Sequence, residues 1–341
     1  MNLNFLEVEE IVRRALNEDI GTGDLTTALT VSPVSLCMAR IIANDEGVIA
    51  GLPVASIVFR MAAECYAAGN MTIVKRMRSP RGPNVRIEGP TQAGKPIRIT
   101  AKHLGKPAVQ ITGGPVQQRK PIEQDRPLIF RPEVADGSIV QAGDMVAEIT
   151  GPTAAILTAE RTALNFLQRL SGIATRTARM VALVDGIGPS IVDTRKTTPG
   201  LRILEKYAVR VGGGQNHRFG LYDAVLIKDN HIQATGGIKE AIEAAKAGTS
   251  HMIKIEVEAD TLAHVEQALE AGADIILLDN MNVAGMKKAV EMCKGRAITE
   301  ASGRITEDNV VKVAQTGVDL ISIGALTHSV KALDLSLDIA G

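Results

Sequence analysis

Short apolar runs alternate with stretches of helical periodicity throughout the second half of the chain. Each run is rich in Val, Ile and Leu and ends in polar or small residues. The ends of successive runs lie 35, 30, 21, 23 and 22 residues apart, which is enough for a strand and a crossover helix. Near-continuous apolar strands of this kind are typical of a parallel sheet. The runs cover residues 190–193, 224–228, 253–258, 275–279, 297–302 and 320–324.

This rhythm is compatible with a doubly wound sheet or with a β/α barrel, and the polar residues favour the barrel. Charged groups stand at the C-terminal ends of the runs, such as Asp193, Lys228, Glu258 and Asp279. Barrel enzymes build their sites at that end of the strands. We therefore predict an α/β protein in which residues 173–323 form an open, TIM-like β/α barrel with parallel strands.

The first half of the chain carries a different pattern. Apolar residues at helical spacing predict an amphipathic helix over 4–16, with acids early and bases late. Residues 134–151 indicate short strands separated by turns, and a strong helix is predicted from about 153 to 173. We expect residues 1–172 to form an N-terminal α/β sandwich domain, with the C-terminal segment 324–341 packing back on it.

Residues 78–133 interrupt this domain as a basic insertion rich in Pro and Gly, a composition that disfavours long helices. The insertion holds 11 Lys and Arg residues against four acids, a net charge of +7. A surface hairpin or partly disordered insertion is favoured, and a basic flap that gathers anionic substrates is an alternative. A nucleic-acid contact is disfavoured because Phe130 is the only aromatic residue available for stacking. If the insertion is peripheral, its deletion leaves measurable turnover.

Composition narrows the remaining classes of protein. The 341 residues are 45% hydrophobic and 2% aromatic, so the core must be aliphatic. A net charge of zero argues against general attraction to nucleic acid or anionic membranes, and no apolar run approaches the roughly 18 residues of a membrane span. Cys37, Cys65 and Cys293 form no metal or disulfide pattern. With no signal peptide in the sequence, we expect a cytoplasmic protein without nucleic-acid or membrane partners.

Cationic side chains gather at the ends of the first barrel strands. Arg195 and Lys196 follow the first run, and Lys228 ends the second. His217 and Arg218 follow a Gly-rich loop between them. Like charges at roughly 4 Å repel by about 1–4 kcal/mol per pair. Because Arg binds carboxylate or phosphate as a fork and Lys as a point charge, we hypothesise that a multiply anionic ligand, not the protein itself, balances this cluster.

The ends of the later predicted strands carry acidic residues in place of basic ones. Glu258 and Asp279 stand at successive strand ends, where paired acids suit ribose hydroxyls, a Mg²⁺ shell or a positively charged, sugar-like transition state. The segments 302–303 and 324–325 place small residues ahead of helical stretches. Small residues there let backbone N–H groups approach a phosphate. The predicted pocket therefore accepts a polyanion at one end and a phosphosugar at the other.

Six segments, in order over both predicted domains, resemble one enzyme family. Together they make the chain similar to the quinolinate phosphoribosyltransferases, also called carboxylating nicotinate-nucleotide pyrophosphorylases. The insertion at 78–133 is the part that the family pattern does not cover. The segments are EDIGTGDLTT (18–27), DTRKTTPGLR (193–202), GGGQNHR (212–218), LIKDNH (226–231), LDN (278–280) and GALTHS (324–329).

The resemblance implies a reaction and a cofactor. Quinolinate, a pyridine with two adjacent carboxylates, reacts with 5-phosphoribosyl-1-pyrophosphate (PRPP) in the presence of Mg²⁺. The products are nicotinate mononucleotide, pyrophosphate and CO₂, in a step of de novo NAD biosynthesis. The pyridine nitrogen is itself the nucleophile, so no activated Ser or Cys is required.

The resemblance also implies roles for single residues. Arg161 is contributed by a neighbouring subunit in this family, which implies a homodimer or larger oligomer with a shared active site. Mg²⁺ is held mainly through PRPP, with Glu258 and Asp279 as candidate ligands. The implied catalytic residues are Lys196, Lys228, Glu258 and Asp279. The implied substrate-binding residues are Arg161, Arg195, His217, Arg218 and Lys228 for quinolinate, Lys196, Lys228, Glu258 and Asp279 for PRPP, Ser302, Gly303, Arg304, Ile323, Gly324 and Ala325 for its 5′-phosphate, and Thr194 without assignment to one substrate.

Other interpretations stay open at this stage. A strand-end lysine such as Lys228 is often solvated, or forms a Schiff base in an apolar pocket. A paralogue with another substrate, such as the molybdenum-locus pyrophosphorylase-like proteins, or a non-catalytic pyridine- or phosphosugar-binding protein would share much of the pattern. Arg304 stands where many family members carry a second glycine, and either adds a phosphate contact or crowds the loop. We interpret His231 and His328 as structural.

Overall fold

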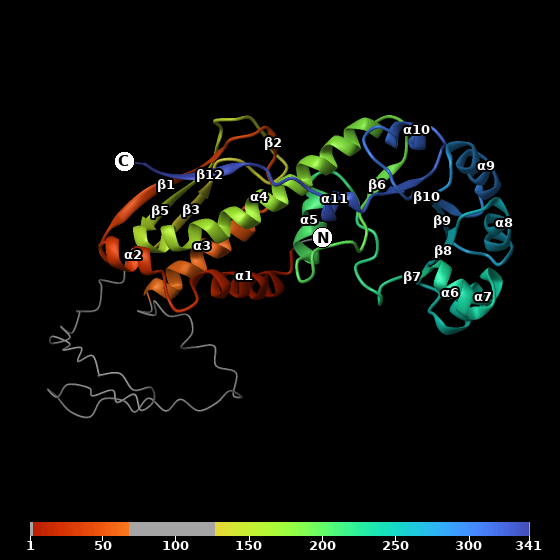
Figure 1. The fold of residues 1–341 in the computed structure, drawn as a ribbon, viewed down its shortest axis with the longest axis horizontal. Helices are drawn as coiled ribbons and strands as arrows, with labels where there is room; N and C mark the ends of the chain where they lie inside the picture. Colours follow the sequence, from red (N-terminus) through yellow and green to blue (C-terminus); the bar gives the residue numbers. More distant parts are fainter. Residues whose placement is uncertain (1–2, 68–126, 341) are drawn as a thin grey trace, which may run out of the picture.

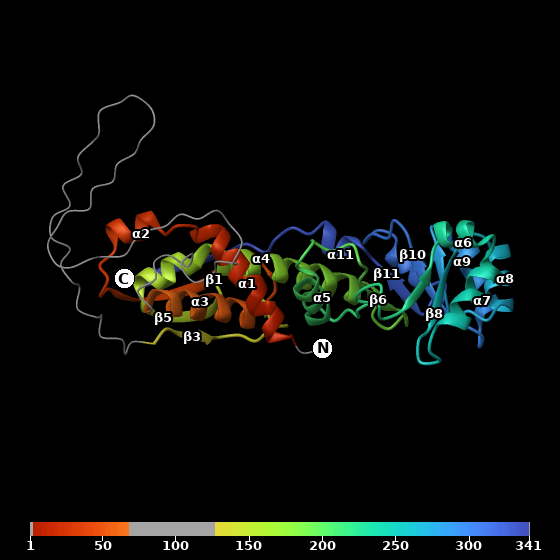
Figure 2. The same cartoon turned by 90° about the horizontal axis from the view of Figure 1, so that it is seen from below.

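The computed structural model describes residues 3–67 and 127–340. Within these ranges the chain forms two lobes along one long axis, with one helix running from the first lobe into the second (Figures 1 and 2). The N-terminal lobe contains an antiparallel sheet and the C-terminal lobe a parallel sheet. Residues 78–126 of the predicted insertion lie outside the described residues.

The C-terminal lobe is the predicted open barrel, and all six predicted strands are confirmed. Its strands are hydrogen-bonded in the order β6-β11-β10-β9-β8-β7. In the part of the chain that the structure describes, β6 and β7 do not pair with each other, so the barrel is open there, and Gln215 forms a single bridge to Val192 beside the gap. The strands are β6 (Ser190–Val192), β7 (Val225–Ile227), β8 (Ile255–Ala259), β9 (Ile275–Asp279), β10 (Ile298–Ser302) and β11 (Leu320–Ser322).

Helices follow these strands and lie on the outside of the parallel sheet (Figure 1). Two begin at capping side chains: Thr261 Oγ1 accepts from the His264 N–H at 3.2 Å, and Asn282 Oδ1 from the Gly285 N–H at 2.9 Å. The strand-to-helix loops therefore collect at the C-terminal edge of the sheet. The helices are α5 (Arg202–Val211), α6 (Asp229–Thr235), α7 (Ile238–Gly248), α8 (Leu262–Glu270), α9 (Val283–Cys293), α10 (Val310–Ala314) and α11 (Ala325–His328).

The N-terminal lobe is built on an antiparallel sheet in the order β12-β1-β5-β3. Its first strand in this order comes from the C-terminus of the chain, where Leu335 pairs with Ala43 and Ala340 with Met38. Figure 1 shows the helices α1, α2 and α3 in the same lobe. The elements are α1 (Phe5–Ile20), α2 (Leu25–Thr30), β1 (Leu36–Ala43), β2 (Gly47–Val48), α3 (Leu52–Ala67), β3 (Ile129–Pro132), β4 (Ile139–Val140), β5 (Met145–Pro152) and β12 (Leu335–Ala340).

Strand β3 corrects the predicted end of the insertion. The sequence pattern assigns residues 127–133 to the insertion, but β3 pairs with β5 from Ile129↔Thr150 to Pro132↔Ala147. Proline is tolerated there because β3 is an edge strand of this sheet. A deletion through Glu133 would therefore remove a strand of the N-terminal sheet.

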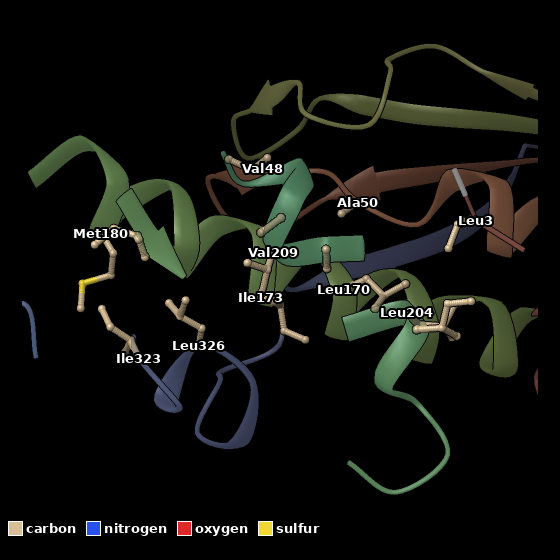
Figure 3. Close-up of a cluster of buried hydrophobic side chains, with 14 of the residues drawn as sticks. Leu3, Val48, Ala50, Leu170, Ile173, Met180, Leu204, Val209, Ile323 and Leu326 are labelled. Carbon is tan, nitrogen blue, oxygen red and sulfur yellow. The ribbon is translucent and has the colours of Figure 1, made fainter. Parts of the chain in front are cut away.

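The helix α4 (Thr153–Val184) joins the lobes. The apolar pattern predicts its end near residue 173, but the helix continues because Met180 and Val184 are also buried. Figure 3 shows Ile173 and Met180 of α4 near Ile323 and Leu326 of the barrel lobe. The expected domain boundary at 172–173 thus falls inside a continuous helix. None of the described helices is long and apolar enough to cross a bilayer.

Small and polar residues let α4 pack closely against other segments. The Ala50 N–H donates to Ser171 Oγ at 3.0 Å, and the Val48 N–H donates to Thr175 Oγ1 at 2.8 Å. Between them, a Cβ at Gly172 would collide with the carbonyl oxygen of Lys331. The middle of α4 is therefore in contact with both the N-terminal lobe and the segment that returns to it.

Candidate active site

The predicted site residues meet in one cavity at the C-terminal edge of the barrel strands. The cavity has a volume of about 840 Å³. Arg161 alone among the predicted residues does not line it; this side chain is exposed on α4. The predicted residues in the lining are Thr194, Arg195, Lys196, His217, Arg218, Lys228, Glu258, Asp279, Ser302, Gly303, Arg304, Ile323, Gly324 and Ala325.

Asp193 links the end of β6 to the loop that carries His217. Its buried Oδ1 accepts from Lys206 Nζ at 2.5 Å and from the His217 backbone N–H at 2.9 Å. Its Oδ2 accepts from Asn216 Nδ2 at 2.7 Å. Burial raises the pKa of Asp193 and lowers the pKa of Lys206, so each ion depends on the other to stay charged. This network fixes the loop that carries His217 to the end of β6.

Two arginines enter the cavity without an acidic partner among the described residues. The Nε atoms of Arg195 and Arg218 are buried and lack a hydrogen-bond partner there. Arg218 donates through Nη1 to the carbonyl of Ala224 at 3.1 Å. Burial and the neighbouring Arg195 guanidinium lower the pKa of Arg218. Buried donors normally have acceptors, so these two guanidinium groups indicate that an anionic ligand accepts their hydrogen bonds.

The hypothesis that a ligand alone balances the cations is wrong for two residues. Lys228 Nζ is ion-paired with Glu258. His217 Nε2 lies 3.0 Å from Glu256 Oε2 and 3.7 Å from Glu300 Oε1. The physical reason is that barrel strands bring acids to the same interior, where unpaired cations would be costly.

The strand-end pattern does not identify Glu300, which lines the cavity, or Glu256, which pairs with His217 beside it. A strand repeats its direction every two residues, so Glu256 shares the inward face of Glu258, and Glu300 shares that of Ser302. This spacing was the available signal. Burial, and then the charge of Glu256, raise the pKa of Glu300 to about 7. Burial opposes protonation of His217, but hydrogen bonding to Glu256 and the charges of both acids raise its pKa.

Glu258 and Asp279 supply the acidic side of the cavity from neighbouring strands. Glu258 Oε2 faces the Asp229 N–H at 3.4 Å, and Asp279 Oδ2 accepts from Asn280 Nδ2 at 2.8 Å. Two carboxylates at adjoining strand ends are hard oxygen ligands of the kind that Mg²⁺ accepts alongside substrate oxygens. The donor set therefore fits a metal that arrives with a phosphorylated substrate.

Backbone geometry shapes the opposite wall. Gly303 and Arg304 both adopt the left-handed region, with φ of 99° and 52°, and a Cβ at Gly303 would collide with the Asn280 side chain. A Cβ at Gly324 would lie 2.8 Å from Cδ of Lys196. Gly324 therefore leaves the space in which Lys196 extends.

The two histidines interpreted as structural differ in position. His231 Nδ1 accepts from the Lys228 backbone N–H at 2.9 Å, so its structural role at the start of α6 is confirmed. His328 lines the cavity, and its Nδ1 lies 2.7 Å from Ser329 Oγ. His328 therefore lies at the site, and its structural role stays a prediction.

Fold and site define a β/α-barrel protein whose mouth brings together two strand-end carboxylates and two guanidinium groups that have no acidic partner among the described residues. Two family models match the chain: the quinolinate phosphoribosyl transferase N-terminal domain over residues 127–171 and the C-terminal domain over residues 173–338. The chain belongs to the quinolinate phosphoribosyltransferase family.

Relatives and solved structures agree with this assignment. The chain is 38% identical over 337 residues to the probable nicotinate-nucleotide pyrophosphorylase [carboxylating] of Bacillus subtilis (strain 168), covering 99% of this chain and 95% of that protein. It is 36% identical to the decarboxylating quinolinate phosphoribosyltransferase 2a of Nicotiana tabacum, covering 98% and 82%. The nicotinate-nucleotide pyrophosphorylase structure from Francisella tularensis superposes with a TM-score of 0.78 at 34% identity, covering 99% and 98%.

Proposed function

We propose that this protein is a decarboxylating phosphoribosyltransferase that converts quinolinate and PRPP into nicotinate mononucleotide, pyrophosphate and CO₂, in NAD biosynthesis. The observation that carries the proposal is the convergence of Arg195 and Arg218, both without acidic partners among the described residues, with Lys196 in one cavity. A ring with two adjacent carboxylates supplies the missing acceptors for these donors.

The quinolinate end of the cavity is formed by the loops after β6 and α5. Arg195 and Arg218 are the primary carboxylate ligands in this proposal, with Thr194 beside them. His217 and Lys228 also face the cavity, but each already has an acidic partner. We infer that these two orient the ring and contribute less binding energy than the arginines.

PRPP occupies the acidic side and the small-residue loops. Glu258 and Asp279 bind the ribose hydroxyls, and Lys196 neutralises the departing pyrophosphate. Mg²⁺ bound to PRPP, with Glu258 and Asp279 as its candidate protein ligands, would neutralise charge on the leaving pyrophosphate. The 5′-phosphate is assigned to Ser302, Gly303, Arg304, Ile323, Gly324 and Ala325.

This arrangement can accelerate the reaction without a protein nucleophile. Loss of pyrophosphate leaves positive charge on the ribose ring, which carboxylates at two strand ends stabilise. The pyridine nitrogen attacks the anomeric carbon directly, so most of the acceleration must come from fixing two anions in line. The crowded guanidinium groups perform that task.

We further infer that a second copy of the chain completes the site. Arg161 lies on α4 and does not line the cavity of its own chain. An exposed arginine on one lobe is free to reach the cavity of a partner subunit, which adds a third guanidinium group for the carboxylates. A homodimer or larger oligomer in the cytoplasm is therefore part of the proposal.

The experiment incubates purified protein with quinolinate, PRPP and Mg²⁺, and follows CO₂ and nicotinate mononucleotide, with nicotinate in place of quinolinate as the substrate control. Turnover of nicotinate but not quinolinate would contradict the proposal. We expect Arg195→Ala and Lys228→Ala to reduce quinolinate turnover by at least about 100-fold, as removal of single charge-stabilising donors does. Both variants should remain folded by circular dichroism.

Lys239→Ala provides the matched control for these variants. Lys239 is an exposed cation on α7 that is ion-paired with Glu243 one turn away, and the Lys239→Ala variant should turn over quinolinate at the normal rate. Full activity in both site variants would remove the assignment of this cavity.

A further inference from the structure

Glu256 and Glu300 have no role in the reaction as proposed above, yet both are nearly inaccessible to solvent, with exposed fractions of 4% and 1%. They rise from alternate strands, β8 and β10, and both approach Nε2 of His217. Two carboxylates that share one imidazole in a buried wall are costly if both are ionised. One of the pair is therefore expected to hold a proton.

Geometry distinguishes the two acids. Glu256 Oε2 is within hydrogen-bond distance of His217 Nε2, at 3.0 Å, whereas Glu300 Oε1 is 3.7 Å from that nitrogen. On both acids Oε1 is buried and has no hydrogen-bond partner among the described residues. Glu300 lines the substrate cavity, and Glu256 does not. Glu256 is thus the acid that pairs with His217, while Glu300 is the acid that lines the cavity.

The surroundings of Glu300 decide whether it holds a proton. The charged groups that act on it are Glu256 from β8, His217 from the loop after α5 and Asp193 at the end of β6, and Ser322 on β11 is its polar neighbour. Burial and the two acids favour the neutral form of Glu300, and His217 and Ser322 oppose it. The result is a pKa of about 7, where a general acid is most effective at neutral pH.

We propose that Glu300 donates the proton that replaces the departing carboxylate on the substrate ring. The inference rests on the proposed function, because only a decarboxylating reaction leaves a ring carbon in need of a proton. Glu300 would then be a catalytic residue, with Glu256 and His217 as positioning residues.

The proposed step balances without any further reactant. After phosphoribosyl transfer the ring nitrogen is positive. The bond between the adjacent carbon and its carboxylate breaks, CO₂ leaves, and the electron pair stays on the carbon. The O–H bond of Glu300 then breaks as a C–H bond forms at that carbon. Glu300 remains as a carboxylate beside the pyridinium ring and regains a proton from water after product release.

Glu300→Gln tests the proposal because it keeps the shape of the side chain and removes the acid. Single turnovers with quinolinate, PRPP and Mg²⁺ would follow pyrophosphate, CO₂ and nicotinate mononucleotide separately. We expect pyrophosphate release within about tenfold of the normal rate and nucleotide formation slower by about 10²–10⁴, the usual effect of losing a general acid. Without a donor the ring carbanion recaptures CO₂. Glu291→Gln, an exposed acid on α9, is the matched control.

The pH dependence gives a second, independent measurement on the unaltered protein. Product formation in a single turnover should fall as the pH rises above about 7, and Glu300→Gln should lose this dependence. Glu300→Asp, which retains an acid, should form product faster than Glu300→Gln.

Three results would overturn the inference: normal product formation by Glu300→Gln, equal losses of pyrophosphate release and product formation, or an unchanged pH profile. Equal losses would indicate a binding or structural role. Failure of the unaltered protein to release CO₂ from quinolinate would instead overturn the proposed function, and with it this step.

Discussion

Arg304 is, with Asn280, one of two non-glycine residues lining the cavity that adopt a positive φ. Its φ of 52° lies in the left-handed region, which costs an ordinary L-residue about 1–2 kcal/mol. Its carbonyl accepts from Asn309 Nδ2 at 3.0 Å, and its exposed side chain lines the cavity. A residue retained at such a position is expected to contribute to binding.

Comparison of Arg304→Gly with Arg304→Ala separates strain from binding. Both variants lose the guanidinium, so both should raise the KM for PRPP by a similar factor. Only glycine relieves the backbone strain, although glycine also raises the conformational entropy of the unfolded chain. The net result should be a glycine variant that is more stable than the alanine variant by about 0.5–1 kcal/mol in urea unfolding. A less stable glycine variant would show that the backbone there is not strained.

Gly324 leaves the space for Lys196. Gly324→Ala would bring a Cβ to 2.8 Å from Lys196 Cδ, so the lysine must move while the fold persists. We expect kcat/KM for PRPP to fall by about tenfold or more, since small misplacements of a binding group have large kinetic effects. At Gly285 an added Cβ meets nothing nearer than 3.5 Å, so Gly285→Ala should retain normal kinetics. Equal kinetics for both variants would contradict this account.

At the scale of elements, the sequence predicts the barrel strands but not which side chains from different strands meet. The six barrel strands follow from the repeating apolar runs, and the strand ends identify Arg195, Lys228 and Asp279 as site residues. Glu256 and Glu300 lie on strands that are not adjacent in the sheet. Their convergence on one histidine depends on the curved shape of the barrel, which the sequence pattern does not specify. The sequence pattern did not predict the edge strand β3, because its Pro and Arg residues have the same composition as the insertion before it.

The middle of α4 has no room for added volume at Gly172. Gly172→Ala would force a Cβ into the carbonyl oxygen of Lys331, and overpacking of this kind typically costs about 1–3 kcal/mol. Gly248→Ala at the end of α7, where nothing lies within 4 Å of the new Cβ, should leave stability unchanged or raise it slightly. Urea unfolding of both variants measures the difference, and equal stabilities would mean that the return segment yields easily.

For the whole molecule, the buried acid–histidine cluster makes stability depend on pH. The pKa of Glu300 is raised from 4.5 to about 7, and the pKa of His217 is also raised, so the folded state holds extra protons. Both contributions are present at low pH and are lost as the pH rises through the folded pKa values. The free energy of unfolding should therefore fall by on the order of 1–3 kcal/mol between about pH 5 and pH 8.

Thermal or urea unfolding across this pH range provides the measurement. Glu300→Gln should flatten the dependence, because the amide does not titrate. Glu291→Gln should leave it unchanged. A dependence that is undiminished in Glu300→Gln would assign it to other groups, including His217.

The continuity of α4 limits how this gene can be divided. Ser171 and Thr175 hydrogen-bond to the first lobe, while Met180, a few residues later, packs in the second. A break at residue 172 would therefore leave each fragment with only part of the helix that both lobes pack against. Neither half would be able to cover its own apolar interior, and we expect both to aggregate when expressed separately. Exchange of barrels between relatives should succeed only if the whole helix travels with one parent.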